Sequence, residues 1–266
     1  MAQRISGGAV FIADRDPSMP MIRQISVADL FQALGKGVED FLAAPTQLLF
    51  LGLIYPVVGG AAAAFAAQTD VIPMLYPLIA GITLMGPLAA VGLYEVSRQR
   101  EMGRPVTWRN AFDVRHSPAL GSVAWLGALL LTLFVGWLAV AERIYGATMG
   151  GLPPADSMEF LRQLISTREG WSMIIIGNAV GFVFALTVLC LTVVSFPFLL
   201  HRNGGIWRAI KVSVLAVRCN PALMLLWGLM VAGLLLLGCL PLFVGLAVVM
   251  PILGHATWHL YRAMVV

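Results

Sequence analysis

The sequence predicts an all-α protein, a polytopic membrane helix bundle with six transmembrane helices arranged as three hairpins and amphipathic interfacial helices between them. Two features of the composition predict this class. The chain of 266 residues is 59% hydrophobic and only 11% charged, whereas about 25% of the residues in a soluble domain are charged. The apolar residues also gather in blocks without Asp, Glu, Lys or Arg, which are residues 41–69, 71–94, 117–141, 170–200 and 219–261.

The lengths of these blocks predict the number of spans. A helix needs roughly 20 apolar residues to cross about 30 Å of hydrocarbon, so each of the first four blocks is long enough for one span. The fifth block would run on the order of 60 Å as a single helix, so we expect it to turn back near Gly238 and Pro241. The predicted spans are 44–67, 72–96, 118–141, 172–200, 221–239 and 242–260.

The positions of the basic residues predict the orientation. Fourteen of the 17 Lys and Arg residues fall in the N-terminal arm, in the loops 95–116 and 201–220, or in the tail. Because cytoplasmic loops of membrane proteins carry an excess of basic residues, we expect both the N- and C-termini to be cytoplasmic. The expected location is the bacterial inner (cytoplasmic) membrane. The basic charge indicates contact with anionic lipid rather than with nucleic acid.

Amphipathic segments are expected between the spans. Ser26 followed by Asp29 resembles a capping box, and an apolar stripe then predicts a helix that lies in the cytoplasmic interface. The members of this stripe are Leu30, Leu34, Val38 and Phe41. Residues 107–115 and 205–217 are expected to lie in the same interface, and residues 156–165 to form a short amphipathic helix on the opposite surface.

The predicted domain organisation is simple. Residues 1–22 are expected to form a disordered cytoplasmic arm, and residues 23–266 a single six-span membrane domain. An internal repeat suggests the three hairpins, because VRHSPAL at 114–120 and VRCNPAL at 217–223 are identical at five of seven positions. Such a repeat indicates a pseudo-threefold bundle, and the alternative is coincidence among common membrane residues.

Histidines near the end of the chain are the candidate ligands. His255 and His259 are four residues apart, a helical spacing that places both imidazoles on one face, where they could bind a metal or haem together with His201. A bundle site of this kind normally has carboxylate support, and we expect none beside these histidines. We interpret the motif as a membrane-interface anchor and expect no metal site and no cofactor. The anchor residues are Trp258, Tyr261 and Arg262.

A small-residue motif in the fourth predicted span suggests close helix packing. Gly177 and Gly181 are separated by three residues and flank Asn178, the most polar side chain deep in a span. Such a face lets two helices approach closely, and the asparagine can form a hydrogen bond across the contact. We interpret these residues as packing positions within the bundle. The alternative is a seam with a second copy or with another membrane protein.

No catalytic constellation is expected. Ionisable side chains inside hydrocarbon are costly and mark coupled transporters, and none occurs near the middle of a predicted span. No Ser-His-Asp set and no pair of aspartates is expected at one depth. The sequence therefore predicts neither an enzyme nor an ion-coupled transporter.

Two stretches near the ends of the chain carry a family resemblance. They are residues 25–29 leading to 41–45, and the closing motif LGHATWHLYR at 253–262. Over about residues 22–264 the chain resembles an uncharacterised family of bacterial integral membrane proteins known only as a domain of unknown function. Some members are named as cytochrome c oxidase subunits, which implies a respiratory setting. A haem-copper oxidase core has many more spans and its histidine ligands come from several helices, so the resemblance implies an accessory or assembly protein.

These observations predict a non-catalytic accessory, assembly or scaffold protein. The alternative is a small uncoupled channel or transporter for apolar or lipid-like solutes. A central polar cavity would favour the alternative, and its expected lining is Thr83, Thr132, Asn178, Thr187 and Thr192. The expected partners are the lipid bilayer, with anionic lipid, and a membrane protein or a second copy of the chain.

Overall fold

The computed structural model describes residues 2–4, 10–12, 19–44, 72–150, 157–241 and 244–266. Their contacts divide the chain into two compact units, and each is described here by itself. Unit 1 comprises Met1–Ile54, Pro87–Gly127 and Leu189–Val266, and unit 2 comprises Tyr55–Gly86 and Ala128–Val188. The sequence predicts one membrane domain over residues 23–266, and that division stays a prediction.

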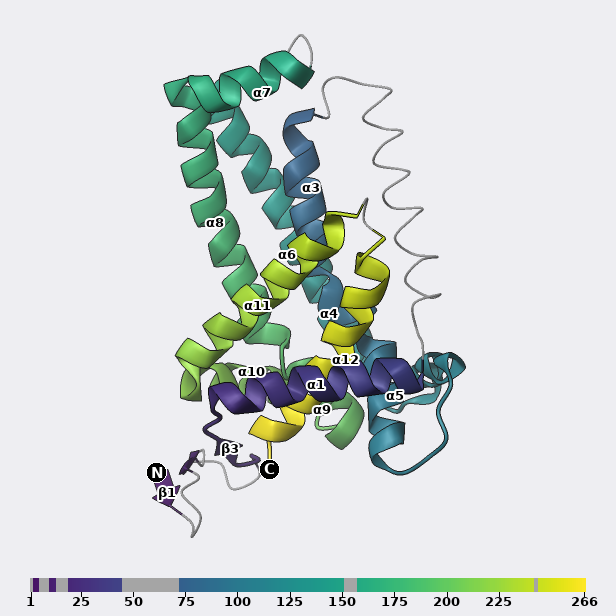
Figure 1. The fold of residues 1–266 in the computed structure, drawn as a ribbon. Coiled ribbons are helices and arrows are strands. Elements are labelled where there is room, and N and C mark those ends of the chain that lie inside the picture. Colours follow the sequence, from purple (N-terminus) through teal and green to yellow (C-terminus); the bar gives the residue numbers. More distant parts are fainter. Residues whose placement is uncertain (1, 5–9, 13–18, 45–71, 151–156, 242–243) are drawn as a thin grey trace. The chain divides into compact units, whose positions relative to one another are not determined.

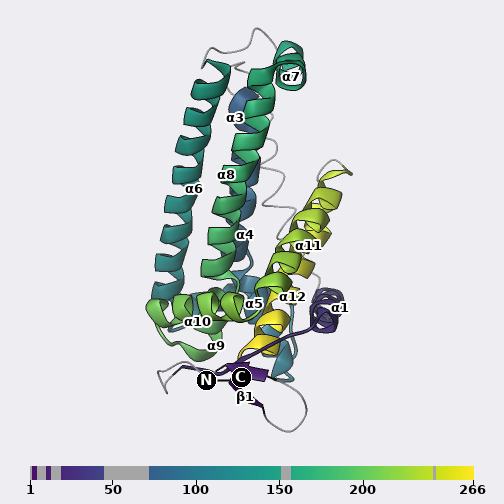
Figure 2. The ribbon, with the colours of Figure 1, turned by 90° about the vertical axis from the view of Figure 1, so that its left-hand side faces the viewer.

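Unit 1 is helical apart from a small antiparallel sheet with the strand order β1-β2-β3. Two of these strands fall within residues 1–22, where the sequence predicts a disordered arm. The elements of unit 1 (Figures 1 and 2) are β1 (Ala2–Arg4), β2 (Val10–Ile12), β3 (Ile22–Arg23), α1 (Val27–Ala43), α5 (Val91–Glu101), the 3-10 helix η2 (Trp108–His116), α9 (Ser195–Arg202), α10 (Ile206–Cys219), α11 (Pro221–Cys239) and α12 (Leu246–Met264).

Helix α1 begins with the predicted capping box. The backbone N–H of Asp29 donates to Ser26 Oγ, and the backbone N–H of Ser26 donates to Asp29 Oδ2. The buried face differs from the predicted stripe, because Leu30 is fully buried in protein while Val38 is exposed. The inward face is instead formed by Leu30, Ala33, Gly37 and Asp40.

Helix α1 lies directly against α12 (Figure 1). A Cβ atom added at Gly37 would lie 2.7 Å from the carbonyl oxygen of Ile252 and 2.8 Å from the Cβ of Ala256. Only a glycine permits this approach, since real Cβ atoms do not come so close to a neighbouring backbone. The glycine therefore sets the distance between the two helices.

The end of α12 is joined to the segment before α1. Ile22 pairs with Val265 in an isolated antiparallel bridge, and the backbone N–H of Val266 donates to the carbonyl oxygen of Met21 at 3.1 Å. Arg23 Nε also donates to the carbonyl oxygen of Ala263 at 2.8 Å. Segments from the two ends of the described chain thus meet in unit 1.

Unit 2 consists of α3 (Ile72–Leu84), α7 (Ser157–Ser166) and the adjoining parts of α6 (Leu120–Met149) and α8 (Arg168–Thr192). Its core is built around Trp137, which is 3% exposed and whose Nε1 donates to the carbonyl oxygen of Pro77 at 2.7 Å. The ring of Phe184 packs against the indole of Trp137. Gly81 lets α3 approach α6 closely, since an added Cβ would lie 2.5 Å from the ring of Phe134.

Three helices of the described residues are long and apolar enough to cross a membrane, namely Leu120–Met149, Arg168–Arg202 and Pro221–Cys239. They correspond to the predicted spans 118–141, 172–200 and 221–239. Six spans are not confirmed, because 45–67 lies outside the described residues and 242–260 corresponds to α12, which is not among these three helices.

The predicted span 72–96 is a series of three helices, α3, α4 (Gly86–Ala89) and α5. The break between the first two falls at Met85, directly before Gly86 and Pro87, which begin α4. Proline has no N–H to donate and its ring clashes with the preceding turn, so a continuous helix is disfavoured there.

The segments expected between spans do form helices, which are η2, α10 and α7. The two copies of the repeated motif adopt different structures. In the first, VRHSPAL, the 3-10 helix η2 is followed by a turn; in the second, VRCNPAL, Asn220 connects α10 to α11. Whether these helices lie in a membrane interface stays a prediction.

Candidate functional site

The three histidines do not form one site. His255 is fully buried in α12, and His259 lies one turn further along at the edge of a groove. His201, on α9, instead contacts Tyr261, with 2.7 Å between its Nδ1 and the tyrosine hydroxyl. Among the described residues, no group of three or more His, Cys, Asp or Glu side chains is placed to hold a metal ion.

A carboxylate that the sequence analysis missed joins the other two histidines. Asp40 Oδ2 accepts hydrogen bonds from His259 Nε2 at 2.8 Å and from Ser97 Oγ at 2.5 Å, and Asp40 Oδ1 pairs with Arg100. Ser97 Oγ also lies 2.8 Å from His255 Nδ1. The expectations that no carboxylate accompanies these histidines, and that Ser, His and Asp do not meet, are therefore wrong. Helix α1 folds back against α12, and no local pattern in the sequence indicates that contact.

We refer to Asp40, Ser97, Arg100, His255 and His259 as the Asp40 cluster. The order of serine, histidine and aspartate in this cluster differs from that of a catalytic triad. A serine hydroxyl has one hydrogen and a carboxylate only accepts, so the hydroxyl of Ser97 donates to Asp40 and accepts from Nδ1–H of His255. In a triad the histidine stands between serine and aspartate and removes the serine proton. Here the serine stands in the middle and is 0% exposed. The arrangement ties α1, α5 and α12 together and presents no nucleophile.

The charge on Asp40 is maintained by its partners. Burial raises the pKa of Asp40, whereas hydrogen bonds from His259 and Ser97 and the charge of His259 lower it, and the net result is a pKa below the ordinary value. The carboxylate is thus ionised at neutral pH although the residue is only 3% exposed. A buried charge of this kind is stable only while its partners stay in place.

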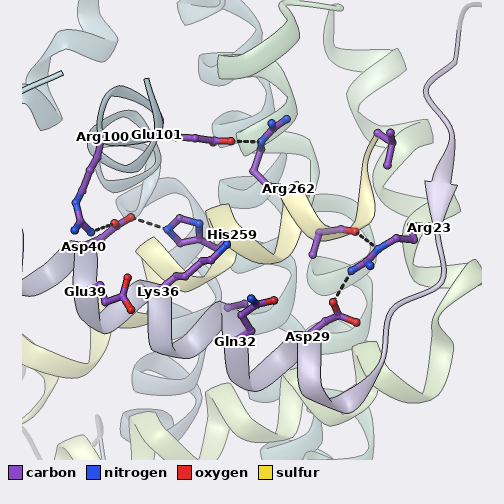
Figure 3. Close-up of a pocket in the computed structure, with 13 residues that line it drawn as sticks. Arg23, Asp29, Gln32, Lys36, Glu39, Asp40, Arg100, Glu101, His259 and Arg262 are labelled. Atoms are coloured by element: carbon purple, nitrogen blue, oxygen red, sulfur yellow. Dashed lines mark hydrogen bonds and ion pairs between the residues drawn. The ribbon is translucent and has the colours of Figure 1, made fainter. Parts of the chain in front are cut away.

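An open groove of about 660 Å³ lies beside the Asp40 cluster (Figure 3). Its walls come from α1, α5, α12 and the segment around Arg23. Ion pairs occupy most of its charged groups, which are Arg23 with Asp29, Arg262 with Glu101, and Arg100 with Asp40. Lys36 and Glu39 point from α1 into the groove and form no ion pair among the described residues.

Comparison with known proteins finds a family model that matches part of the chain. Residues 75–201 match the model of a family described as predicted integral membrane protein. We refer to residues 75–201 as the DUF2189 region, after the name of that model. The match confirms the resemblance to an uncharacterised family of integral membrane proteins, over a shorter range than expected and without support for the cytochrome c oxidase name. Searches of curated proteins and of solved structures each found no match.

The residues that carried the predicted resemblance, 25–45 and 253–262, lie outside the DUF2189 region. Ser97 and Arg100 of the Asp40 cluster lie inside the DUF2189 region. The other members, Asp40, His255 and His259, lie outside it. The cluster therefore joins the DUF2189 region to the helices that precede and follow it in the chain.

Two of the three predicted anchor residues lie in the interior of unit 1, and Arg262 lies at the groove. Trp258 and Tyr261 are fully buried. Trp258 Nε1 donates to Glu101 Oε2 at 3.0 Å, and Arg262 Nε donates to Glu101 Oε1 at 2.9 Å. These contacts attach α12 to the C-terminal end of α5, while the role of the three residues at a membrane interface stays a prediction.

The small-residue motif of the DUF2189 region contacts neighbours within unit 2. An added Cβ at Gly181 would lie 3.2 Å from Cη2 of Trp137, whereas an added Cβ at Gly177 would meet nothing within 4 Å. Asn178 Oδ1 accepts a hydrogen bond from the hydroxyl of Tyr76 at 2.9 Å, which connects α8 to α3. Gly181 and Asn178 thus contact neighbours within the unit, and the choice between packing and a seam stays a prediction.

This geometry gives a prediction for the two glycines. Gly181→Leu should destabilise the chain by about 1–3 kcal/mol, because the larger side chain must displace the indole of Trp137 from a packed position. Gly177→Leu is expected to leave the thermal unfolding midpoint in detergent unchanged. Size-exclusion chromatography of both variants checks the alternative, since a shift in the oligomeric state with Gly177→Leu alone would place that glycine in a seam between copies.

Proposed function

We propose that this integral membrane protein is a non-catalytic accessory, assembly or scaffold protein of the bacterial inner membrane. The observation that carries the proposal is the mutual engagement of the polar groups in unit 1. Asp40, Ser97 and His255 are buried, Ser97 forms hydrogen bonds with both of the others, and the ion pairs of the groove hold its walls together. A reactive centre instead presents groups to a substrate.

The contact between the ends of the described chain supports an even number of membrane crossings. Ile22 and Val265 pair directly, so the segments that contain them lie on the same side of any membrane that the intervening chain crosses. Three candidate spans then require at least one more crossing. This supports the six-span arrangement with both termini on one side, and the excess of basic residues supports the cytoplasmic side.

The alternative is an uncoupled channel or transporter for apolar or lipid-like solutes. Three of its expected lining residues donate their hydroxyl hydrogens to their own helices, Thr83 to Ala80, Thr132 to Ala128 and Thr187 to Val183. These hydroxyls offer a passing solute little beyond their remaining lone pairs, so the side-chain contacts favour the scaffold.

A lipid-translocation assay separates the two. The purified chain is reconstituted into phosphatidylcholine vesicles with a trace of fluorescent phosphatidylcholine, and dithionite destroys the label of the outer leaflet. For a scaffold, the loss of fluorescence should match that of protein-free vesicles. A further loss that Asn178→Leu prevents would overturn the proposal. Crosslinking at native expression gives the positive result, a membrane protein recovered in fixed stoichiometry with the chain.

A further inference from the structure

We propose that the exposed face of α10 binds the phosphate headgroups of anionic phospholipids. The face consists of Trp207, Lys211 and Arg218, and we refer to it as the α10 face. The inference rests on the proposed placement of the chain in a membrane. It goes beyond that placement by naming the residues that contact lipid and the chemical group that they bind.

The α10 face is a regular helical stripe. Its three residues are exposed and recur at four- and seven-residue intervals, which are the spacings of one helix face. The opposite side of α10 is buried, and its buried residues are Ala209, Val212, Ser213, Ala216 and Val217. Packing of this buried side therefore fixes the orientation of α10 about its own axis, so that Trp207, Lys211 and Arg218 are exposed on one side.

The cations of the α10 face have no acidic partner. Lys211 and Arg218 form no ion pair among the described residues, and α10 contains no acidic residue. Other basic groups are engaged within the chain. Arg162 on α7 pairs with Glu159, and the guanidinium of Arg109 lies over the ring of Trp108 on η2. The α10 face is thus a positive surface that has no counter-charge among the described residues.

Trp207 distinguishes a lipid surface from an acidic protein in solution as the source of that charge. Its side chain is 76% exposed, the largest value among the large apolar side chains of the described residues. An exposed indole is stable at the headgroup level, where its ring contacts apolar groups and its N–H meets polar ones. A tryptophan in line with lysine and arginine is typical of a helix that lies on a membrane surface.

The neighbouring helix places headgroups within reach. α10 ends at Cys219, and α11, a candidate span without a charged residue, begins at Pro221. Arg218 is therefore three residues from the start of a helix that is long and apolar enough to enter hydrocarbon. Figures 1 and 2 show α10 lying crosswise to α11 at this end. If α11 crosses the membrane, a helix in that position lies along the membrane surface at the N-terminal end of α11.

The test measures the preference of the full-length chain for phosphatidylglycerol over phosphatidylcholine. The chain is reconstituted in nanodiscs with equal amounts of both lipids, and native mass spectrometry counts the lipids retained after release. We expect wild type to retain phosphatidylglycerol preferentially. Because each interfacial cation contributes about 1 kcal/mol, Lys211→Gln with Arg218→Gln should lower this preference about tenfold or more.

Two further variants make the result specific. Lys211→Arg with Arg218→Lys keeps both charges and should keep the preference. Lys36→Gln with Arg162→Gln removes the same total charge from α1 and α7, away from the α10 face, and should also keep it. An unchanged preference in the α10 glutamine variant, or an equal loss in the Lys36 and Arg162 variant, would overturn the inference.

The outcome is separable from that of the proposed function. Unfolding midpoints in phosphatidylcholine alone should be equal for wild type and the two α10 variants, because Lys211 and Arg218 are exposed and form no ion pair among the described residues. Lipid translocation by wild type would overturn the scaffold proposal and leave the phosphatidylglycerol preference intact. An acidic protein that binds the α10 face in detergent without any lipid preference would contradict the inference alone.

Discussion

Asp40→Ala is expected to lower the free energy of unfolding by about 3–5 kcal/mol, the usual result of removing one member of a buried ion pair. The change leaves Arg100 and His259 without their carboxylate and Ser97 without its acceptor. Because α1 bears Asp40 while its partners come from α5 and α12, the attachment of α1 should weaken most. Denaturant unfolding in detergent, followed by circular dichroism, measures the loss.

Glu39 provides the matched control for Asp40. It is the adjacent acidic residue on α1, it is exposed, and it forms no ion pair among the described residues. Glu39→Ala should therefore change the free energy of unfolding by no more than about 0.5 kcal/mol. Equal losses for the two variants would show that the Asp40 cluster does not hold the helices together.

The pH dependence of stability gives a second readout of the same cluster. The pKa of Asp40 is lower in the folded chain than its unfolded value of about 3.9. Its contribution to stability is therefore present above that value and is lost as the pH falls through the depressed pKa. Wild type should lose more stability than Asp40→Asn when the pH is lowered below about 4. Parallel curves for the two proteins would contradict this assignment.

Gly37→Ala is expected to destabilise the chain by about 1–3 kcal/mol. The new methyl group would clash with backbone atoms of α12, which cannot move aside as a side chain can by changing its rotamer. The added Cβ would lie 2.7 Å from the carbonyl oxygen of Ile252 and 2.8 Å from the backbone nitrogen of Ala256. Helix α1 must move outward, and Asp40, one turn further on, moves with it. The thermal unfolding midpoint measures the effect.

The second glycine of α1 is the control. An added Cβ at Gly35 meets nothing within 4 Å. Gly35→Ala should raise stability by up to about 1 kcal/mol, because alanine has the higher helix propensity. The double variant Gly37→Ala with Asp40→Ala should lose less than the sum of its parts, since both changes weaken one contact. A strictly additive loss would mean that the glycine contact and the Asp40 cluster act separately.

The sequence predicts local features of this fold well. Ser26 and Asp29 indicate the start of α1 because a capping box is formed within a single turn. The uncharged blocks indicate α6, α8 and α11 because the criterion for a span is length and composition. At 72–96 the same criterion does not indicate that the helix is interrupted near Gly86 and Pro87. A proline at this position outweighs the hydropathy of its neighbours.

The Asp40 cluster could not be predicted in the same way. Asp40 and His259 are 219 residues apart, and their pairing depends on the close approach at Gly37. Trp258 and Tyr261 illustrate a different ambiguity. An aromatic ring with a polar end suits a membrane interface and equally a protein interior that offers it a partner, here Glu101 or His201.

Because Ile22 pairs with Val265, unit 1 contains segments that are synthesised at very different times during translation. Helix α1 is synthesised well before α12, which covers its inner face. At about 5–20 residues per second, the intervening chain takes on the order of ten to forty seconds to synthesise. During that interval Leu30 lacks the cover of α12 and Asp40 lacks His259, although Ser97 and Arg100 are made earlier. Unit 1 therefore assembles only after translation of α12, when the earlier spans have already been synthesised.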